Sequence, residues 1–280
     1  MNALPTTAVL IPARRASTRL PEKLLLAEHG EPLLATAAKR AAQAFGSQSV
    51  IVCADDQALL AALAPTGIAG RLTRIDHSSG TDRIAEVAAT LSAEIIVNVQ
   101  GDEPEMEPEH IRLVAGLLAQ HPWAGIATLC VAGGAEEQAN PNNVKVVLGA
   151  IGEGSGEGRL GMGRGTMASA IPAHADQAPP LAEGRALWFT RCPAVYDRDA
   201  GGPSARCHRH LGIYAYRREV LLGYAGLPAS RLEQTEKLEQ LRALEAGIGI
   251  ACAVVDQAQP GIDVRSDYDS FLARWQKKTP

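Results

Sequence analysis

The sequence predicts an α/β fold built on a mainly parallel central sheet, and two features of the chain carry this prediction. Short apolar runs alternate with amphipathic segments, which is the pattern of repeated β-α-β units. The early apolar runs at residues 8–11, 50–53 and 95–99 are compact and rich in β-branched residues, as strands buried on both faces are. Large α/β folds often take a chain of 280 residues as one unit, so we expect a single domain over residues 1–280.

Amphipathic periodicity and further apolar runs supply the remaining elements in chain order. Helices are expected at residues 32–45, 56–63, 81–91 and 108–120. Strands are expected at residues 125–131, 144–148, 186–190 and 211–216. Two helices at residues 232–246 and 266–277 close the chain, and Ser266 is the better N-cap candidate for the last of them.

Composition and charge exclude several classes of protein. Hydrophobic residues make up 46% and charged residues 21%, and no apolar run approaches the roughly 18 residues that span a bilayer. The opening MNALPTTAVL has no positive charge before its apolar run, so a signal peptide is not expected. A net charge of −4 gives no general attraction to nucleic acid, and five scattered cysteines describe no disulfide framework. We expect a cytoplasmic protein without membrane insertion or a nucleic-acid partner.

Residues 149–185 interrupt the α/β pattern. This segment holds nine glycines and three prolines in 37 residues and has no aromatic residue. Such a composition buries too little apolar surface to offset its ordering entropy, so we expect an inserted surface loop between two strands. Gly156, Gly158 and Gly161 match the spacing of the dinucleotide fingerprint, but no strand leads into them and no helix follows, so we reject a Rossmann site there.

A basic loop follows the first predicted strand. Arg14, Arg15, Arg19 and Lys23 put four cations into ten residues at the carboxyl end of that strand, where open α/β sheets bind ligands. Arginine forks and a lysine ammonium bind phosphate oxygens well, so a phosphate site is one interpretation. A solvated basic loop is the other. The chain has no GxxxxGK[ST] sequence, which excludes a Walker loop.

Two aspartates are candidate magnesium ligands. Asp102 ends the apolar strand at 95–99 in a Gly-Asp turn, and a carboxylate at that edge can hold Mg²⁺ against nucleotide phosphates. An ordinary turn aspartate is the alternative. Asp263 precedes the last helix and is a possible second ligand or part of the helix entry. In His77-Ser78-Ser79-Gly80, the turn before the helix at 81–91 presents backbone groups that could contact a base edge.

These motifs in this order resemble the 3-deoxy-D-manno-octulosonate (Kdo) cytidylyltransferase family. The resemblance covers nearly the whole chain outside residues 149–185, and two of its motifs, NVQGDEP and RHLGIYAYR, are highly specific. The matching stretches are IPARRASTRLPEK (11–23), HSSGTDRIAEV (77–87), IIVNVQGDEP (95–104), NPNNVKVVL (140–148), ALWFTRCPAVYDRD (186–199), HRHLGIYAYR (208–217), LEQTEKLEQLRALEAG (232–247) and GIDVRSDYD (261–269).

The resemblance implies a three-layer nucleotidyltransferase fold with a smaller β-rich dimerisation lobe, and therefore a homodimer. It implies that CTP and Kdo are the substrates, that CMP-Kdo and pyrophosphate are the products for lipopolysaccharide biosynthesis, and that Mg²⁺ is the cofactor. The residues implied at the cytidine or the triphosphate are Ala13, Arg14, Ser79 and Gly80. The catalytic residues implied are Lys23 on the β- and γ-phosphates, with Asp102 and Asp263 on Mg²⁺. The residues that match the sugar-acid pocket are Arg15, His210, Tyr214, Glu239 and Gln240.

Several alternatives stay open at the level of sequence. Glu239 and Gln240 would point about 100° apart on one helix, so one of them is expected to act indirectly. A sibling cytidylyltransferase for sialic acid or an amino-substituted Kdo would share the phosphate loop, and no side chain stands out as a general base. A metal-dependent glycosyltransferase usually has an Asp-x-Asp motif, which Asp102-Glu103-Pro104 does not match. A non-catalytic relative would be expected to have lost one of four charged residues, and this sequence keeps all four, Arg14, Lys23, Asp102 and Asp263. Leu24 replaces the usual proline of the family, and the insertion at 149–185 leaves the arrangement of the lobe open.

Overall fold

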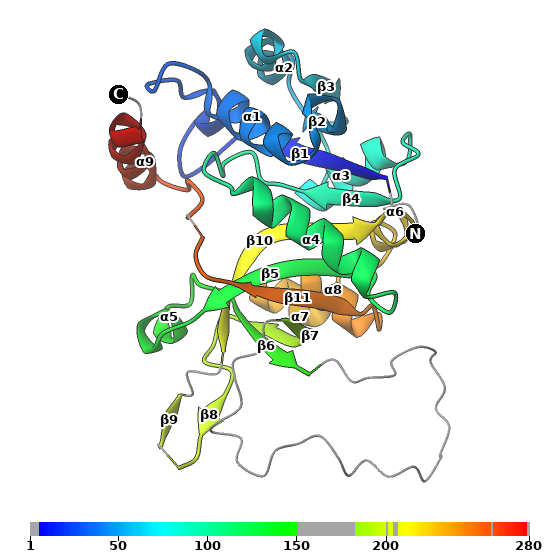
Figure 1. Ribbon diagram of the computed structural model, residues 1–280, viewed down its shortest axis with the longest axis vertical. Helices are drawn as coiled ribbons and strands as arrows, with labels where there is room; N and C mark the ends of the chain where they lie inside the picture. The colour runs from blue at the N-terminus through cyan, green and yellow to red at the C-terminus, as the bar shows by residue number, and fades with distance from the viewer. Residues whose placement is uncertain (1–5, 151–182, 200, 204–206, 259, 279–280) are drawn as a thin grey trace.

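The computed structural model describes residues 6–150, 183–199, 201–203, 207–258 and 260–278. Its centre is a nine-stranded sheet in the order β3-β2-β1-β4-β10-β5-β11-β7-β6 (Figure 1). The strands of this sheet are β1 (Thr7–Ala13), β2 (Val50–Ala54), β3 (Ala69–Leu72), β4 (Ile95–Asn98), β5 (Ile126–Ala132), β6 (Lys145–Gly149), β7 (Glu183–Thr190), β10 (His208–Arg217) and β11 (Ile250–Val255). A separate hairpin pairs β8 (Tyr196–Asp197) with β9 (Gly202–Pro203).

The sheet is mixed, which corrects the expectation of a mainly parallel one. Its first four strands, from β3 to β4, pair in parallel. Strand β10 then runs antiparallel to both β4 and β5, and β7 runs antiparallel to β11 and β6. The expectation failed because apolar β-branched runs mark strands buried on both faces and do not encode strand direction. The basic loop and the Gly-Asp turn follow β1 and β4, two strands of this parallel half, and the carboxyl ends of these strands lie at one edge of the sheet.

Helices cover the sheet on both faces, so the fold has three layers (Figure 1). One face is covered by α1 (Leu33–Phe45), α2 (Gln57–Leu63) and α4 (Pro108–Gln120). The other face is covered by α3 (Gly80–Ala88), α6 (Arg218–Tyr224) and α8 (Gln240–Glu245). Alternation along β1 shows the two cores directly, because Val9 and Ile11 belong to the first and Ala8 and Leu10 to the second.

Several elements differ from the sequence-based expectation. The helix expected at 232–246 is two helices, α7 (Arg231–Glu236) and α8, separated by Lys237 with φ of 55°. A residue in the left-handed conformation ends a helix, and the apolar periodicity of the sequence does not show where this happens. Strands β3, β8, β9 and β11 and the helices α5 (Ala135–Ala139) and α6 were not expected.

The expected loop at 149–185 is shorter at both ends than its composition indicated. Gly149 belongs to β6, and residues 183–185 belong to β7, where Gly149 pairs with Arg185. The interior of that predicted loop, residues 151–182, lies outside the described residues. The two strands on either side of it, β6 and β7, are therefore neighbours in the sheet.

The last helix, α9 (Arg265–Lys278), packs on the loop that follows β1. Tyr268 and Phe271 are fully buried beside Leu20 and Leu33. The expected cap, Ser266, lies inside this helix. Asp267 instead accepts hydrogen bonds from the backbone N–H groups of Asp263 and Val264, at 2.9 and 3.0 Å.

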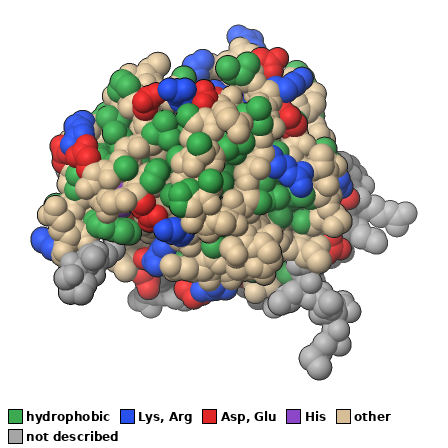
Figure 2. Space-filling view, turned by 90° about the horizontal axis from the view of Figure 1, so that it is seen from above, with side chains coloured by type: hydrophobic (Ala, Val, Ile, Leu, Met, Phe, Trp, Pro, Cys, Tyr) green, Lys and Arg blue, Asp and Glu red, His purple; other side chains and the backbone are tan. Residues whose placement is uncertain are grey.

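The molecular surface carries charges of both signs. On the face shown in Figure 2, Lys and Arg side chains lie among Asp and Glu side chains, with hydrophobic groups between them. This mixture agrees with the small net charge of −4. Within the described ranges, no helix has the length and apolar character that crossing a membrane requires.

Candidate active site

A cleft opens at the carboxyl edge of the parallel half of the sheet. Because β1, β2 and β4 run in the same direction, the segments that follow them meet at this edge. The cleft has a volume of about 460 Å³. Its lining residues are Pro12, Arg14, Ala16, Ser17, Thr18, Arg19, Lys23, Leu24, Ser78, Ser79, Gly80, Gln100, Gly101, Asp102 and Glu239. The basic loop, the Ser-Ser-Gly turn and the Gly-Asp turn therefore form one site.

Lys23 joins the two predicted metal ligands. Its Nζ donates to Asp102 Oδ2 at 2.5 Å and to Asp263 Oδ1 at 3.4 Å, although the three residues lie far apart in the sequence. The Lys23 side chain is only 11% exposed, so its ammonium has little access to water and depends on these carboxylates. Arg19 Nη2 adds a second cation on Asp263 Oδ1, at 2.8 Å.

Local backbone geometry holds the two carboxylates together. The backbone N–H of Ile262 donates to the carbonyl of Asp102 at 3.0 Å, which ties the segment before α9 to the turn after β4. In that turn, a Cβ on Gly101 would lie 3.2 Å from Leu34 Cδ1. Glycine therefore allows the turn to approach α1 closely while Asp102 faces the cleft.

The donor set at Lys23 fits a magnesium ion carried with a phosphate. Within the described ranges, no three His, Cys, Asp or Glu side chains form a group that could hold a metal by themselves. Mg²⁺ typically takes one or two protein carboxylates and completes its shell with substrate phosphates and water. Asp102 and Asp263 already share one cation, the Lys23 ammonium, which shows that both carboxylates can reach a common positive charge.

Glu103 is a carboxylate beside this set that sequence reasoning did not single out. Burial raises its pKa to about 8, and the neighbouring charges of Asp102 and Asp263 contribute in the same direction. Its Oε1 would lie 3.4 Å from a Cβ on Gly212, so its carboxyl group faces β10. It lines an adjacent cavity of about 90 Å³ together with His210. Its position next to Asp102 was the only signal in the sequence.

The Ser-Ser-Gly turn closes the opposite wall of the cleft. Ser79 is the N-cap of α3, and its hydroxyl accepts from the backbone N–H of Asp82. Arg14 Nη2 donates to the carbonyl of His77 at 2.6 Å, which links the basic loop to the turn. A Cβ on Gly80 would lie 3.2 Å from Pro12 Cγ, so glycine allows the turn to sit close to the end of β1. Ala13, the last residue of β1, is fully buried in the core on the opposite face of the sheet and is not among the residues that line the cleft.

Arg15 lies apart from the other residues expected in the sugar-acid pocket. Its guanidinium pairs with Glu22 at 2.8 Å and Asp56 at 3.2 Å on the outer side of the basic loop. Hydrogen bonds to these two carboxylates raise its pKa. The depression that it lines does not include His210.

His210 and Tyr214 face the side of the sheet that α3 and α8 cover. The His210 ring lies edge-to-face with Phe189, at 5.1 Å between ring centroids, and in a tilted arrangement with Tyr214, at 5.3 Å. Burial lowers the pKa of His210 to about 3, so the imidazole is neutral at physiological pH. Thr128 Oγ1 lies 2.7 Å from the carbonyl of Ile213 and 2.8 Å from His210 Nε2. A hydroxyl has one proton, so donation to that carbonyl leaves Thr128 to accept from Nε2–H and leaves Nδ1 as an acceptor.

Glu239 and Gln240 separate as their helical spacing predicts. Glu239 lines the cleft, and its Oε2 accepts from Thr81 Oγ1 at 2.7 Å, while burial raises its pKa. Gln240 is the first residue of α8 and is buried outside the cleft lining. An aromatic row runs from His210 through Tyr214 and Tyr216 to Tyr224, whose hydroxyl donates to the Glu239 carbonyl.

Comparison with known proteins agrees with this geometry. A family model described as cytidylyltransferase matches residues 8–250. A 3-deoxy-manno-octulosonate cytidylyltransferase from Rhodopirellula baltica is 41% identical over 95% of this chain and 97% of its own length. The chain belongs to this family. A second member, from Rhodopseudomonas palustris, is 42% identical over 95% of both chains.

A solved structure supports the family assignment at the level of the fold. It is a CMP:2-keto-3-deoxy-manno-octonic acid synthetase complexed with CTP, and it is 36% identical to this chain. It covers 98% of this chain and 99% of its own, with a TM-score of 0.81. The mixed sheet is therefore the architecture of a cytidylyltransferase of this family.

Proposed function

We propose that this protein transfers the cytidylyl group of CTP to the 2-hydroxyl of Kdo, giving CMP-Kdo and pyrophosphate. The observation that carries this proposal is the meeting of Lys23, Asp102 and Asp263 in a cleft whose walls hold Arg14 and the Ser-Ser-Gly turn. Family membership identifies the substrates, and the relative solved with CTP supports the nucleotide.

The reaction is an in-line displacement at phosphorus. The 2-hydroxyl oxygen of the sugar acid forms a bond to the α-phosphorus while the bond to the pyrophosphate oxygen breaks. The protein accelerates such a step mainly by positioning both reactants and by offsetting negative charge. Arg14, Arg19 and Lys23 provide positive charge at the cleft, which suits a triphosphate.

Mg²⁺ is the proposed cofactor, held by Asp102 and Asp263. When bound, it would supply positive charge at the phosphate oxygens and could lower the pKa of a coordinated hydroxyl. Lys23 would then exchange these two carboxylates for the β- and γ-phosphates of CTP. The contacts of Lys23 with both carboxylates support this exchange, because they hold its ammonium in the cleft beside the proposed metal ligands.

The sugar acid would lie between the phosphates and the aromatic row. Glu239 offers a carboxylate at the cleft, and His210 offers the Nδ1 acceptor of a neutral ring. Tyr214 remains a hydrogen-bonding phenol because burial raises its pKa well above the ordinary value. Arg15 would act on the sugar only indirectly, since Glu22 and Asp56 hold its guanidinium, and Gln240 would do so because it is buried and does not line the cleft.

We further propose that the protein is a cytoplasmic homodimer in lipopolysaccharide biosynthesis. The β-rich region formed by β6, β7 and the β8–β9 hairpin carries exposed apolar side chains. Leu187 is 54% exposed, Trp188 37% and Tyr196 68%. Large exposed apolar groups on one region favour a protein interface, which supports assigning the dimerisation lobe to these strands.

A substrate panel tests the proposed function. Purified protein is incubated with each nucleoside triphosphate and with Kdo, amino-substituted Kdo or sialic acid, and pyrophosphate release is followed. We expect release only with CTP and, among the acids, the highest kcat/KM with Kdo. A preference for the amino-substituted acid or for sialic acid would assign the protein to a sibling activity, and no release with any pair would refute the proposal.

A further inference from the structure

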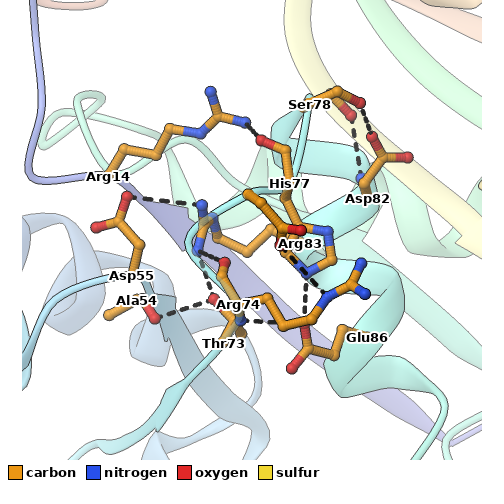
Figure 3. A network of polar contacts seen from close by, with 12 residues as sticks. Arg14, Ala54, Asp55, Thr73, Arg74, His77, Ser78, Asp82, Arg83 and Glu86 are labelled. Carbon is orange, nitrogen blue, oxygen red and sulfur yellow. Dashed lines mark hydrogen bonds and ion pairs between the residues drawn. The ribbon is translucent and has the colours of Figure 1, made fainter.

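Arg83 is an arginine behind the cleft whose side chain is fully buried. It projects from α3, and its Nη1 donates to Thr73 Oγ1 and, at 3.0 Å, to the carbonyl of Arg74 (Figure 3). Its Nη2 lies 3.6 Å from Asp55 Oδ2. One guanidinium therefore holds α3, the segment after β3 and the end of β2 together.

The partners of Arg83 also hold the loops that form the cleft. Asp55 Oδ1 accepts from the backbone N–H of Arg15 at 2.9 Å, so the Arg83–Asp55 pair extends to the basic loop. On the other side, Arg74 leads into the turn at residues 77–80, whose His77 carbonyl accepts from Arg14. Arg83 thus supports both the basic loop and the Ser-Ser-Gly turn without lining the cleft itself.

Stability alone does not explain an arginine at this position. Its Nε and Nη2 have no hydrogen-bond partner among the described residues, and burial lowers its pKa against the opposing effect of Asp55. Well-packed apolar residues often replace buried ion pairs without loss of stability. The planar fork of arginine can reach Thr73, Arg74 and Asp55 together, whereas a lysine ammonium is a single point charge.

We propose that Arg83 is a positioning residue that sets the base specificity of the nucleotide site by fixing the turn at residues 78–80 against the basic loop. This inference rests on the proposed function. Cytosine accepts a hydrogen bond at N3 and donates one from its 4-amino group, whereas uracil donates from N3–H and accepts at its 4-oxo group. Backbone groups can distinguish them only while they are held to within about 0.5 Å, and misplaced hydrogen-bonding groups lose that discrimination.

Arg83→Lys tests the proposal because it retains the charge and removes the fork. Steady-state kinetics are measured with CTP and with UTP at saturating Kdo, and with varied Kdo at saturating CTP. We expect the KM for CTP to rise about tenfold, the KM for Kdo to change by less than about twofold, and the preference for CTP over UTP in kcat/KM to fall about tenfold. Arg71→Lys is the matched control, since Arg71 is an exposed arginine on β3 that bonds to Thr90. It should leave all three quantities unchanged.

A second pair of variants decides the outcome if Arg83→Lys does not fold. Thr73→Val removes the hydroxyl that accepts from Arg83, and Thr73→Ser keeps it. We expect Thr73→Val to lose preference for CTP over UTP in the same direction and Thr73→Ser to keep it. An unchanged preference in the folded variants, with only a lower Tm or an equal loss for CTP and Kdo, would overturn the inference. Wild-type protein that forms no product would instead refute the proposed function, so the two failures are distinct.

Discussion

At the scale of single residues, Lys23 and Arg19 are two cations on the same carboxylate that differ in their exposure to solvent. Both contact Asp263 Oδ1, but the Lys23 side chain is 11% exposed and that of Arg19 is 65% exposed. Exposed ion pairs contribute between about 0 and 1 kcal/mol because water and salt screen them. A shielded ammonium interacts more strongly with a phosphate that enters the same space. We therefore expect Lys23 to contribute more to CTP binding than Arg19.

Lys23→Ala should weaken CTP much more than Kdo. We expect the dissociation constant for CTP to rise by about 10- to 100-fold and that for Kdo by less than about threefold, because the lost charge faces the triphosphate. Isothermal titration of each ligand separately measures both constants. Equal losses for the two ligands would show that Lys23 supports the structure of the cleft in general.

His210 predicts a defined pH dependence of stability. Its ordinary pKa of 6.5 applies to the unfolded chain, and burial lowers the folded value to about 3. Between these values the unfolded state binds one more proton, so the His210 contribution to folding is complete above pH 6.5 and is lost as pH falls toward 3. In His210→Gln, the slope of the unfolding free energy against pH in this window should be smaller by about 1.4 kcal/mol per pH unit. Denaturant titrations from pH 4 to 6 measure it, and an unchanged slope would contradict a buried neutral imidazole.

Local sequence patterns predicted the candidate site residues that directly follow strands, but not the contacts between residues on different elements. Asp102 was predictable because a Gly-Asp turn ends an apolar strand, and its meeting with Lys23 follows from parallel strands that end at one edge. The links from Arg83 to Asp55 and from Thr128 to His210 join residues on different elements. No local sequence pattern encodes such pairs, so they could not be predicted from the sequence.

At the scale of elements, the break between α7 and α8 precedes Glu239, a residue that lines the cleft. Apolar periodicity continues across residues 232–246, and so it predicted one helix. Lys237 adopts φ of 55° and donates its backbone N–H to Glu233, which ends α7. The chain then restarts with Glu239 as the N-cap residue of α8, and its side chain lines the cleft.

Lys237→Gly should stabilise the protein or leave it unchanged. A left-handed conformation costs a non-glycine residue about 1 kcal/mol, and glycine removes this cost while adding a smaller entropic one. We expect an unfolding free energy higher by up to about 1 kcal/mol, with kcat/KM preserved. Lys237→Ala is the control and should give no gain, because alanine keeps the Cβ. A clear destabilisation by glycine would argue that the Lys237 side chain stabilises this break.

At the scale of the whole molecule, the sheet combines a parallel half, from β3 to β4, with a half of mixed strand directions, in which β5 and β11 pair in parallel and β10 and β7 run antiparallel to their neighbours. The parallel half places the basic loop and Asp102 at one edge. The antiparallel strand β10 brings His210 and Tyr214 beside it, and β6 and β7 extend the sheet beyond β11. Apolar runs predicted most of these strands, but their order and direction depend on pairings far apart in the sequence. The layers were therefore predictable and the mixed topology was not.

Replacing residues 151–182 by a four-residue turn should leave CMP-Kdo synthesis and dimerisation nearly unchanged. Gly149 and Arg185 are paired neighbours, so a short turn can join β6 to β7. Shortening a loop several-fold changes its closure entropy by only about 1–2 kcal/mol. Activity assays and light scattering compare the two proteins. Loss of the dimer together with activity would show that the replaced segment contacts the partner subunit.

The proposed cytidylyl transfer is tested by detecting CMP-Kdo with mass spectrometry after incubation of the protein with CTP, Kdo and Mg²⁺. The wild type should form CMP-Kdo, and Asp102→Asn and Asp263→Asn should each reduce its rate of formation by a factor of about 100 or more. The double variant should be little worse than either single one, because the two carboxylates act as one unit. Circular dichroism should show that all variants are folded. Near-normal product formation by Asp102→Asn at saturating Mg²⁺ would contradict the proposed role of Asp102 as a Mg²⁺ ligand.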